Sequence, residues 1–272
     1  MPPCKTLYVS DLDGTLLNKT ERLSAYTCQT INTLTARGLC FSYATARSYE
    51  TASKVTAGLC TPIPVIVFNG TFILENGTQR RLSENFFTEA QLQHICAVLQ
   101  AHDLHPMVYS FVNGVEKFSY RVAHVTEGMR AFLNTRVDDP RNTPLENEPI
   151  CRGEVFHFTC MGTEPQMRPA YELLKHDFQC LLDRDLYSGY PWFEIMPKQA
   201  SKAAAALQLK KQMQCDRLVC FGDGKNDLSM FEIADECYAV ANANEELKRI
   251  ATAVIESNEQ DGVAKWLRAH CG

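Results

Sequence analysis

The sequence predicts an α/β protein with a doubly wound parallel sheet and an inserted α+β domain. Over the first 70 residues, short apolar strands alternate with helical stretches, and this rhythm returns in the last third of the chain. Short apolar runs separated by helices are typical of a parallel sheet covered on both faces. Between the two regions the pattern changes to hairpins. We therefore expect a Rossmann-like core at 1–82 and 191–272, and an inserted α+β domain at 83–190.

The core is expected to contain six strands and six helices in alternation. Ser24 is a suitable N-cap for the first helix, and Gly38 is a suitable residue to end it. The strands are predicted at Thr6–Ser10, Leu39–Thr45, Pro64–Phe68, Arg217–Phe221, Cys237–Ala241 and Ala253–Glu256. The helices are predicted near Ser24–Arg37, Tyr49–Thr56, Ser201–Met213, Leu228–Ala234, Glu245–Ile250 and Val263–His270.

The middle of the chain follows a different pattern. Asn76-Gly77 and Asn113-Gly114 are hairpin turn signals with strand-like flanks. Asp138–Pro149 is predicted to be a polar loop. Helices are expected near Glu89–Ala101, Thr126–Thr135 and Gln166–Lys175, and strands near Met107–Phe111, Val115–Tyr120, Glu154–Met161 and Gln179–Arg184.

Composition excludes several classes of function. The 272 residues carry a net charge of −5, which argues against a nucleic-acid binder that depends on phosphate contacts. The longest apolar stretches, such as Val65–Phe68, are too short to span a bilayer. Met1–Lys5 has no apolar signal region. We expect no nucleic-acid or membrane partner, and we infer no obligate protein partner.

Twelve cysteines invite a disulfide or zinc interpretation. None forms a CxxC pair, and the histidines are not spaced as zinc ligands. Many lie in apolar runs, as Cys40, Cys160, Cys180 and Cys220 do, where a thiol behaves as a small hydrophobic group. Scattered thiols of this kind predict a reducing compartment, and the cytoplasm is the natural inference.

Two aspartates directly follow the first predicted strand. Side chains two apart on an extended backbone point to the same side, so Asp11 and Asp13 would repel each other unless a metal neutralises them. Gly14 and Thr15 then supply turn chemistry. On this segment alone, a solvated aspartate turn is the alternative.

Three further motifs follow at strand ends or helix starts. Ala44–Ser48 brings a hydroxyl, Lys202 brings a cation, and Gly222–Asp227 brings a second acidic cluster. Together with the first pair of aspartates, this is the set of groups that magnesium-dependent phosphoryl transfer needs. Each has an ordinary alternative when taken alone: a strand-end threonine, a solvated lysine and a pair of capping aspartates.

These four motifs, in this order, resemble the haloacid dehalogenase (HAD) superfamily of phosphatases. The long insert between the second and third motifs is similar to that of the Cof-type, type IIB branch. The resemblance implies that Asp11 is the nucleophile, which forms an aspartyl-phosphate, and that Asp13 is the general acid and then the base. It also implies a Mg²⁺ cofactor at Asp11, Asp223 and the backbone carbonyl of Asp13.

The resemblance further implies a set of residues that bind the phosphate. Arg47 and Asp227 would support the site, the latter by orienting Lys202 or a metal-bound water. The Thr45-Ala46-Arg47 run departs from the usual Thr-Gly-Arg, and Gln199–Ala203 lacks the glycines that commonly flank the lysine. The implied phosphate-binding residues are Leu12, Thr45 through its hydroxyl, Ala46 through its backbone N–H, Lys202 and Asn226.

The activity that the resemblance implies is magnesium-dependent hydrolysis of phosphomonoesters, on sugar phosphates or related small metabolites. A phosphomutase of the phosphomannomutase type is an alternative, and so is a non-enzymatic sensor of phosphorylated metabolites. The substrate is not readable from the sequence. Four residues of the insert and the adjoining loops stand out as candidates for substrate contact, with core packing or solvated surface as their alternatives: Tyr120, Arg121, Tyr187 and Trp192.

Overall fold

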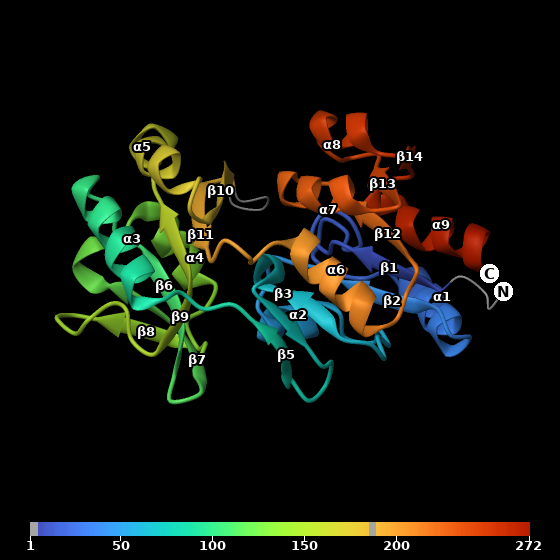
Figure 1. Ribbon diagram of the computed structural model, residues 1–272, viewed down its shortest axis with the longest axis horizontal. Coiled ribbons are helices and arrows are strands. Elements are labelled where there is room, and N and C mark those ends of the chain that lie inside the picture. The colour runs from blue at the N-terminus through green and yellow to red at the C-terminus, as the bar shows by residue number, and fades with distance from the viewer. Residues whose placement is uncertain (1–4, 185–188) are drawn as a thin grey trace. The chain divides into compact units, whose positions relative to one another are not determined.

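The computed structural model describes residues 5–184 and 189–272, and the chain divides into two compact units (Figure 1). The core unit comprises Met1–Glu84 and Ala200–Gly272, and the inserted unit comprises Asn85–Gln199. Strand β11, Pro191–Met196, pairs with strands of the inserted unit, although the sequence analysis places these residues in the core. Within the described ranges, no helix is long and apolar enough to cross a membrane.

The core unit is built on a parallel sheet, as predicted. Its strand order is β14-β13-β12-β1-β2, and every neighbouring pair is parallel. The chain first adds β2 on one side of β1 and later adds β12, β13 and β14 on the other side. The strand order therefore reverses between β1 and β12. In open sheets of this kind, ligands bind beyond the carboxyl ends of the strands at that point. The strands are β1 Thr6–Ser10, β2 Cys40–Tyr43, β12 Arg217–Gly222, β13 Glu236–Val240 and β14 Ala253–Ile255.

A small antiparallel sheet continues the core unit. Its order is β3-β4-β5, and a parallel bridge between Ala44 and Ile66 connects it to the chain that leaves β2. The hairpin that Asn76-Gly77 predicts therefore forms between β4 and β5. The strands are β3 Val65–Val67, β4 Phe72–Leu74 and β5 Arg81–Glu84.

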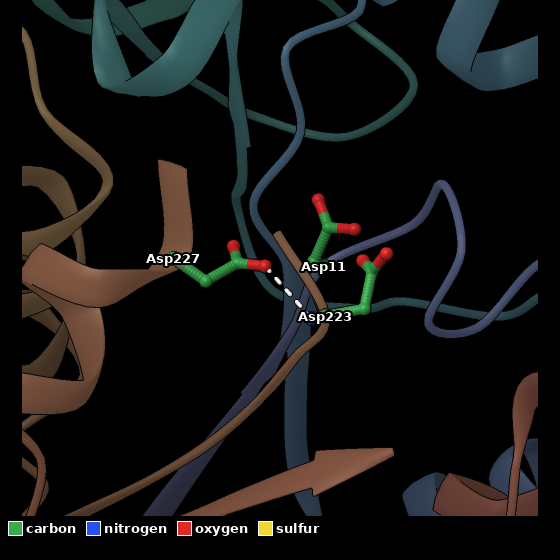
Figure 2. Close-up of side chains that lie close together, drawn as sticks. All are labelled: Asp11, Asp223 and Asp227. Atoms are coloured by element: carbon green, nitrogen blue, oxygen red, sulfur yellow. Dashed lines mark hydrogen bonds between the residues drawn. The ribbon is translucent and has the colours of Figure 1, made fainter. Parts of the chain in front are cut away.

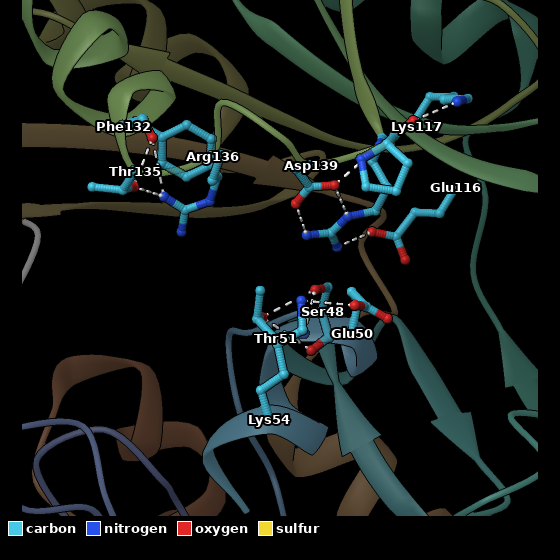
Figure 3. Close-up of polar contacts among 12 residues, drawn as sticks. Ser48, Glu50, Thr51, Lys54, Glu116, Lys117, Phe132, Thr135, Arg136 and Asp139 are labelled. Carbon is cyan, nitrogen blue, oxygen red and sulfur yellow. Dashed lines mark hydrogen bonds and ion pairs between the residues drawn. The ribbon is translucent and has the colours of Figure 1, made fainter.

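The helices of the core unit begin at polar caps that the sequence supplies. Ser24 accepts a hydrogen bond from the Thr27 N–H, and Ser48 does the same for Thr51 (Figure 3). Gly38, just past the first helix, has a φ of +99°, which favours glycine. Helices α1 and α9 pack against each other, and α6 packs against α7. The helices are α1 Ala25–Ala36, α2 Tyr49–Val55, α6 Lys202–Gln212, α7 Leu228–Ile233, α8 Glu245–Ile250 and α9 Gly262–Cys271.

The inserted unit is a six-stranded sheet with the order β10-β11-β9-β6-β7-β8. All neighbouring strands are antiparallel except β7 and β8, which are parallel. Side chains from α3, α5 and the sheet form its apolar core, which includes Ile95, Phe158, Met167 and Phe193. The elements are α3 Glu89–Ala101, β6 Met107–Val112, β7 Val115–Arg121, α4 Glu127–Asn134, β8 Asn142–Leu145, β9 Glu154–Met161, α5 Glu164–Leu174 and β10 Gln179–Arg184.

Two strands of the inserted unit differ from the sequence analysis. The predicted loop Asp138–Pro149 contains β8, and β11 was not predicted. Strand β8 is an edge strand with Pro144 inside it, and proline is tolerated at an edge, where its missing N–H is not needed. Short 3-10 helices complete the chain at Phe68–Gly70, Val122–His124, Lys225–Asp227 and Asn258–Gln260.

Charged side chains fix the segment between α4 and β8. The guanidinium of Arg141 donates to Asp139 over 2.9 and 2.6 Å, and to Glu116 over 2.7 Å. Arg136 lies over the Phe132 ring, with its guanidinium carbon 3.6 Å from the ring centroid (Figure 3). The side chain of Arg141 is 9% exposed, so these charge-assisted bonds are largely shielded from water and hold the segment on the sheet.

Candidate active site

Two aspartates follow adjacent parallel strands at the point where the strand order reverses. Asp11 comes directly after β1, and its N–H donates to the Phe221 carbonyl of β12 over 2.9 Å. Asp223 comes directly after β12. Because the two strands are paired in register, their carboxyl ends lie side by side, and both side chains emerge at the same edge of the sheet.

The side-chain carboxylates of Asp11, Asp223 and Asp227 lie close together, and these three are called the carboxylate group here. One oxygen from each lies within 4.8 Å of the others. Figure 2 shows the carboxylates of Asp11 and Asp223 next to each other, while Asp227 reaches back towards the Asp223 backbone. Asp11 and Asp227 are buried, and Asp223 is half-buried. Hard divalent cations prefer oxygen ligands of this type.

The carboxylate group carries more negative charge than its surroundings favour. Burial raises the pKa of Asp11 well above its usual range, and the charges of Asp227 and Asp223 add to this against the opposing effect of Lys202. Burial, and next the Asp227 charge, raise the pKa of Asp223 to about 7. A bound cation would reverse both effects, so the residues fit a Mg²⁺ ion.

Lys202 supplies a buried positive charge to the group. It is the first residue of α6, after the N-cap Ser201, and its ammonium donates to Asp11 Oδ1 over 2.5 Å and to Asp227 Oδ1 over 2.7 Å. Burial lowers the pKa of Lys202, but the charges of Asp11 and Asp227 outweigh this and raise it overall. The lysine therefore stays protonated between the two carboxylates.

Asp227 also holds the loop that carries Asp223. Its Oδ2 accepts the backbone N–H groups of Asp223 and Gly224, each over 3.0 Å. A Cβ on Gly222 would lie 2.6 Å from the same oxygen, so only glycine fits there. With both oxygens engaged, Asp227 is suited to position Lys202 and the loop, which leaves Asp11 and Asp223 better placed to bind a cation.

The turn after Asp11 is shaped around Asp223. Gly14 has a φ of +79°, and a Cβ there would lie 2.3 Å from Asp223 Oδ2. The Thr15 hydroxyl donates to Asp223 Oδ1 over 2.8 Å, and Asn242 donates to the Gly14 carbonyl over 2.7 Å. The Leu12 carbonyl accepts the N–H groups that tighten this turn. The turn and the Asp223 carboxylate are thus in direct contact.

Asp13 lies outside the carboxylate group. Arg47 donates to its two oxygens, over 2.8 Å from Nε and 2.6 Å from Nη2, and the same Nη2 donates to Glu21 over 2.6 Å. Burial lowers the pKa of Arg47, but its bonds to Asp13 and Glu21 outweigh this and raise it. A bidentate pair fixes the carboxylate in direction as well as position.

Of the remaining predicted residues, Thr45 and Ala46 follow β2, and Asn226 lies in the short 3-10 helix after β12. Thr45 is fully buried, and its hydroxyl accepts the Arg47 N–H over 3.1 Å, while Ala46 is half-buried. Asn226 donates to Asn69 Oδ1 over 3.2 Å. The Thr45 bond lies within one loop, and the Asn226 bond joins two loops; neither of these bonds reaches the carboxylate group.

Three residues support the site in ways that the sequence did not predict: Thr15, expected only as a turn residue, Glu21 and Asn242. Each acts on a partner that is distant in the sequence or carried by another loop, and no local pattern marks such a pair. Among the candidates for substrate contact, Tyr120 is buried, Arg121 donates to the Glu146 carbonyl, and Trp192 packs on the Phe132 ring. Tyr187 lies outside the described residues.

Comparison with known proteins decides the family. The profile of the haloacid dehalogenase-like hydrolases matches residues 8–267. The chain belongs to this family. It is therefore an enzyme of the class that the four motifs predict, and its relatives include proteins named as phosphatases.

Two curated relatives of this haloacid dehalogenase-like hydrolase match it over nearly its whole length. The 5-amino-6-(5-phospho-D-ribitylamino)uracil phosphatase YitU of Bacillus subtilis is 26% identical, with 97% of each chain covered. The pyridoxal phosphate phosphatase YbhA of Escherichia coli is 22% identical, with 96% of each chain covered. Among solved structures, the HAD subclass IIB sugar phosphatase BT4131 has the same fold, with a TM-score of 0.76, 19% identity and coverage of 97% of this chain and 98% of that one.

Proposed function

We propose that this haloacid dehalogenase-like hydrolase is a Mg²⁺-dependent phosphomonoesterase that acts through an aspartyl-phosphate on Asp11. The observation that carries the proposal is the contact of Asp11 with Lys202, within a carboxylate group at the reversal point of the sheet. A carboxylate that must approach a phosphate dianion needs positive charge beside it. Lys202 supplies one such charge, and Mg²⁺ held by Asp11, Asp223 and the Asp13 carbonyl would supply the rest.

Asp11 is proposed to act as the nucleophile, and Asp13 as the general acid and then the general base. The Asp11 carboxylate attacks phosphorus, the ester P–O bond breaks, and Asp13 gives its proton to the leaving alkoxide. Asp13 then takes a proton from water, which attacks phosphorus, breaks the Asp11–phosphoryl bond and releases phosphate. Arg47 donates to both oxygens of Asp13, so transfer of a proton from Asp13 to the leaving group requires that one of these two hydrogen bonds is released.

The predicted phosphate-binding residues would hold the phosphoryl group during these steps. Lys202 has the position for this role, since its ammonium already contacts Asp11. The resemblance assigns the same role to the Thr45 hydroxyl, the Asn226 amide, and the backbones of Leu12 and Ala46. Asp227 would keep Lys202 in place.

The proposed substrates are small phosphorylated metabolites, sugar phosphates or related compounds. YitU and YbhA are named for phosphomonoesters of small molecules, which supports this class. The region 83–190 is proposed to act as the cap of the core. We propose a cytoplasmic location and no nucleic-acid, membrane or obligate protein partner.

Release of inorganic phosphate tests the function. The protein should release phosphate from an aryl phosphate with Mg²⁺ and stop after EDTA, and excess Mg²⁺ should restore the rate. A panel of metabolite phosphates then ranks the substrates. Isomerised hexose phosphate in place of free phosphate would indicate a mutase, tight binding without turnover would indicate a sensor, and full activity after chelation would overturn the metal assignment.

A further inference from the structure

Two cysteines of the inserted unit lie close together, although 55 positions separate them in the sequence. The sulfur atoms of Cys96 and Cys151 are 3.5 Å apart. Cys96 lies on α3, and Cys151 lies in the segment between β8 and β9. Both are half-buried free thiols.

Packing holds each thiol in its place. Both cysteines lie against the apolar core of the inserted unit, and the residue before Cys96, Ile95, is fully buried in that core. On the other side, Gly153 has a φ of +67°, and a Cβ there would lie 2.1 Å from the Phe111 carbonyl of β6. The backbone two residues after Cys151 is therefore fixed against the sheet. The short sulfur–sulfur distance is a property of the folded unit.

We propose that Cys96 and Cys151 are a redox modification site that forms a reversible disulfide by exchange with a low-molecular-weight disulfide. A disulfide bond is about 2.05 Å long, so the sulfur atoms must approach by about 1.5 Å, which is within reach of side-chain rotation. The site lies in the unit that carries none of the proposed catalytic residues. It is thus an addition to the proposed function and independent of it.

The exchange is balanced in two steps. The Cys96 thiolate attacks one sulfur of the external disulfide, so a mixed disulfide forms and the other half leaves as a thiolate. The Cys151 thiol then loses its proton and attacks the Cys96 sulfur, which forms the internal disulfide and releases the second external thiolate. Two protein thiols are oxidised, one external disulfide is reduced to two thiols, and external thiols reverse the reaction.

The environment favours Cys96 as the attacking group. The hydrogen bond from Cys151 lowers the pKa of the Cys96 thiol to about 7. Cys180 packs against the same apolar core, but burial raises the pKa of its thiol to about 12. Because the thiolate is the reactive form, Cys96 should react and Cys180 should not. Cys180 is therefore a matched control.

The test uses glutathione disulfide as the oxidant. The full-length protein is oxidised, blocked with N-ethylmaleimide, digested without reductant and analysed by mass spectrometry. The expected product is a peptide pair linked through Cys96 and Cys151, which dithiothreitol separates. The link should be absent from Cys96→Ser and from Cys151→Ser and unchanged in Cys180→Ser. Separate alkylated cysteines, or a glutathionyl group that persists on Cys96, would overturn the proposal.

Thermal unfolding of the oxidised protein provides a second test. A disulfide that fits the native geometry restricts the unfolded chain, so the Tm of oxidised wild type should exceed that of reduced wild type. The same treatment should not shift the Tm of Cys151→Ser. A lower Tm after oxidation would show that the disulfide distorts the unit. It would contradict the proposal that the fold places the two cysteines for this bond.

Discussion

The Lys202 ammonium lies 2.5 Å from the Asp11 carboxylate, and both side chains are buried at the edge of the core sheet. One lysine cannot balance the three carboxylates of Asp11, Asp223 and Asp227. The site therefore keeps excess negative charge, which a divalent cation can compensate.

Lys202→Met should destabilise the fold and abolish most activity. Removal of one partner from a buried ion pair costs about 3–5 kcal/mol, because an uncompensated charge stays behind. Loss of a positioned charge beside the phosphoryl group should lower kcat by roughly 10²–10³. Urea unfolding and phosphate release measure the two effects.

Lys210→Met is the matched control for this change. Lys210 lies on the same helix, α6, and pairs with Asp235 near the surface. Surface pairs contribute about 0–1 kcal/mol, so this variant should unfold and turn over much as wild type does. If Lys202→Met matched Lys210→Met in both assays, Lys202 would have no role in the site.

Gly14→Ala should weaken Mg²⁺ binding as well as folding. A Cβ at this position lies 2.3 Å from Asp223 Oδ2, so the carboxylate must move. Gly38→Ala provides the comparison, because Gly38 also has a positive φ but nothing lies within 4 Å of its added Cβ. Backbone strain of about 1–2 kcal/mol is expected in both variants. Only Gly14→Ala should require more Mg²⁺ for half-maximal activity, and equal requirements in both would contradict the contact.

Mg²⁺ should raise the Tm of the wild-type protein in a concentration-dependent manner. Ligands that bind only the folded state stabilise it in proportion to the logarithm of their concentration above Kd. Asp223→Asn should lose this response because it removes an anionic ligand. Glu232→Gln removes the same charge from an exposed position of α7 and should keep the response. A response that survives in Asp223→Asn would move the metal site elsewhere.

Asp13→Asn should impair the hydrolysis of alkyl phosphates more than that of aryl phosphates. An aryl oxide leaves without a proton, whereas an alkoxide needs one, and general acid catalysis contributes about 10²–10⁴-fold. The ratio of kcat/KM for the two substrate types, compared between wild type and variant, measures the effect. Equal losses on both substrates would remove Asp13 from the acid role.

Much of the core was predictable because its signals are local. The predicted strand Thr6–Ser10 agrees with β1, and Ser24 caps α1 as expected, because apolar runs and capping side chains act over a few residues. Strands β8 and β11 lacked such signals. Proline obscures the edge strand β8, and β11 belongs to the inserted unit only because it pairs with β9 and β10.

The candidate site shows the same division between local and distant information. The sequence motifs contain Asp11, Lys202 and Asp227, and in the structure Lys202 contacts both aspartates. The motifs alone could not show that Asp13 would pair with Arg47, or that Thr15 would bind Asp223, which lies 208 positions away in the sequence. Such pairs depend on how the loops meet at the sheet edge, which no single segment encodes.

Detection of a phosphoryl group on Asp11 tests the central claim most directly. Asp13→Asn, which should slow breakdown of the intermediate, is mixed with an aryl phosphate and Mg²⁺, quenched in acid within the first turnover, digested and analysed by mass spectrometry. The account predicts one phosphoryl group on the peptide that contains Asp11, and none in the Asp11→Asn, Asp13→Asn double variant. Phosphate release by the Asp13→Asn protein without any phosphorylated Asp11, or with the phosphoryl group on another residue, would contradict it.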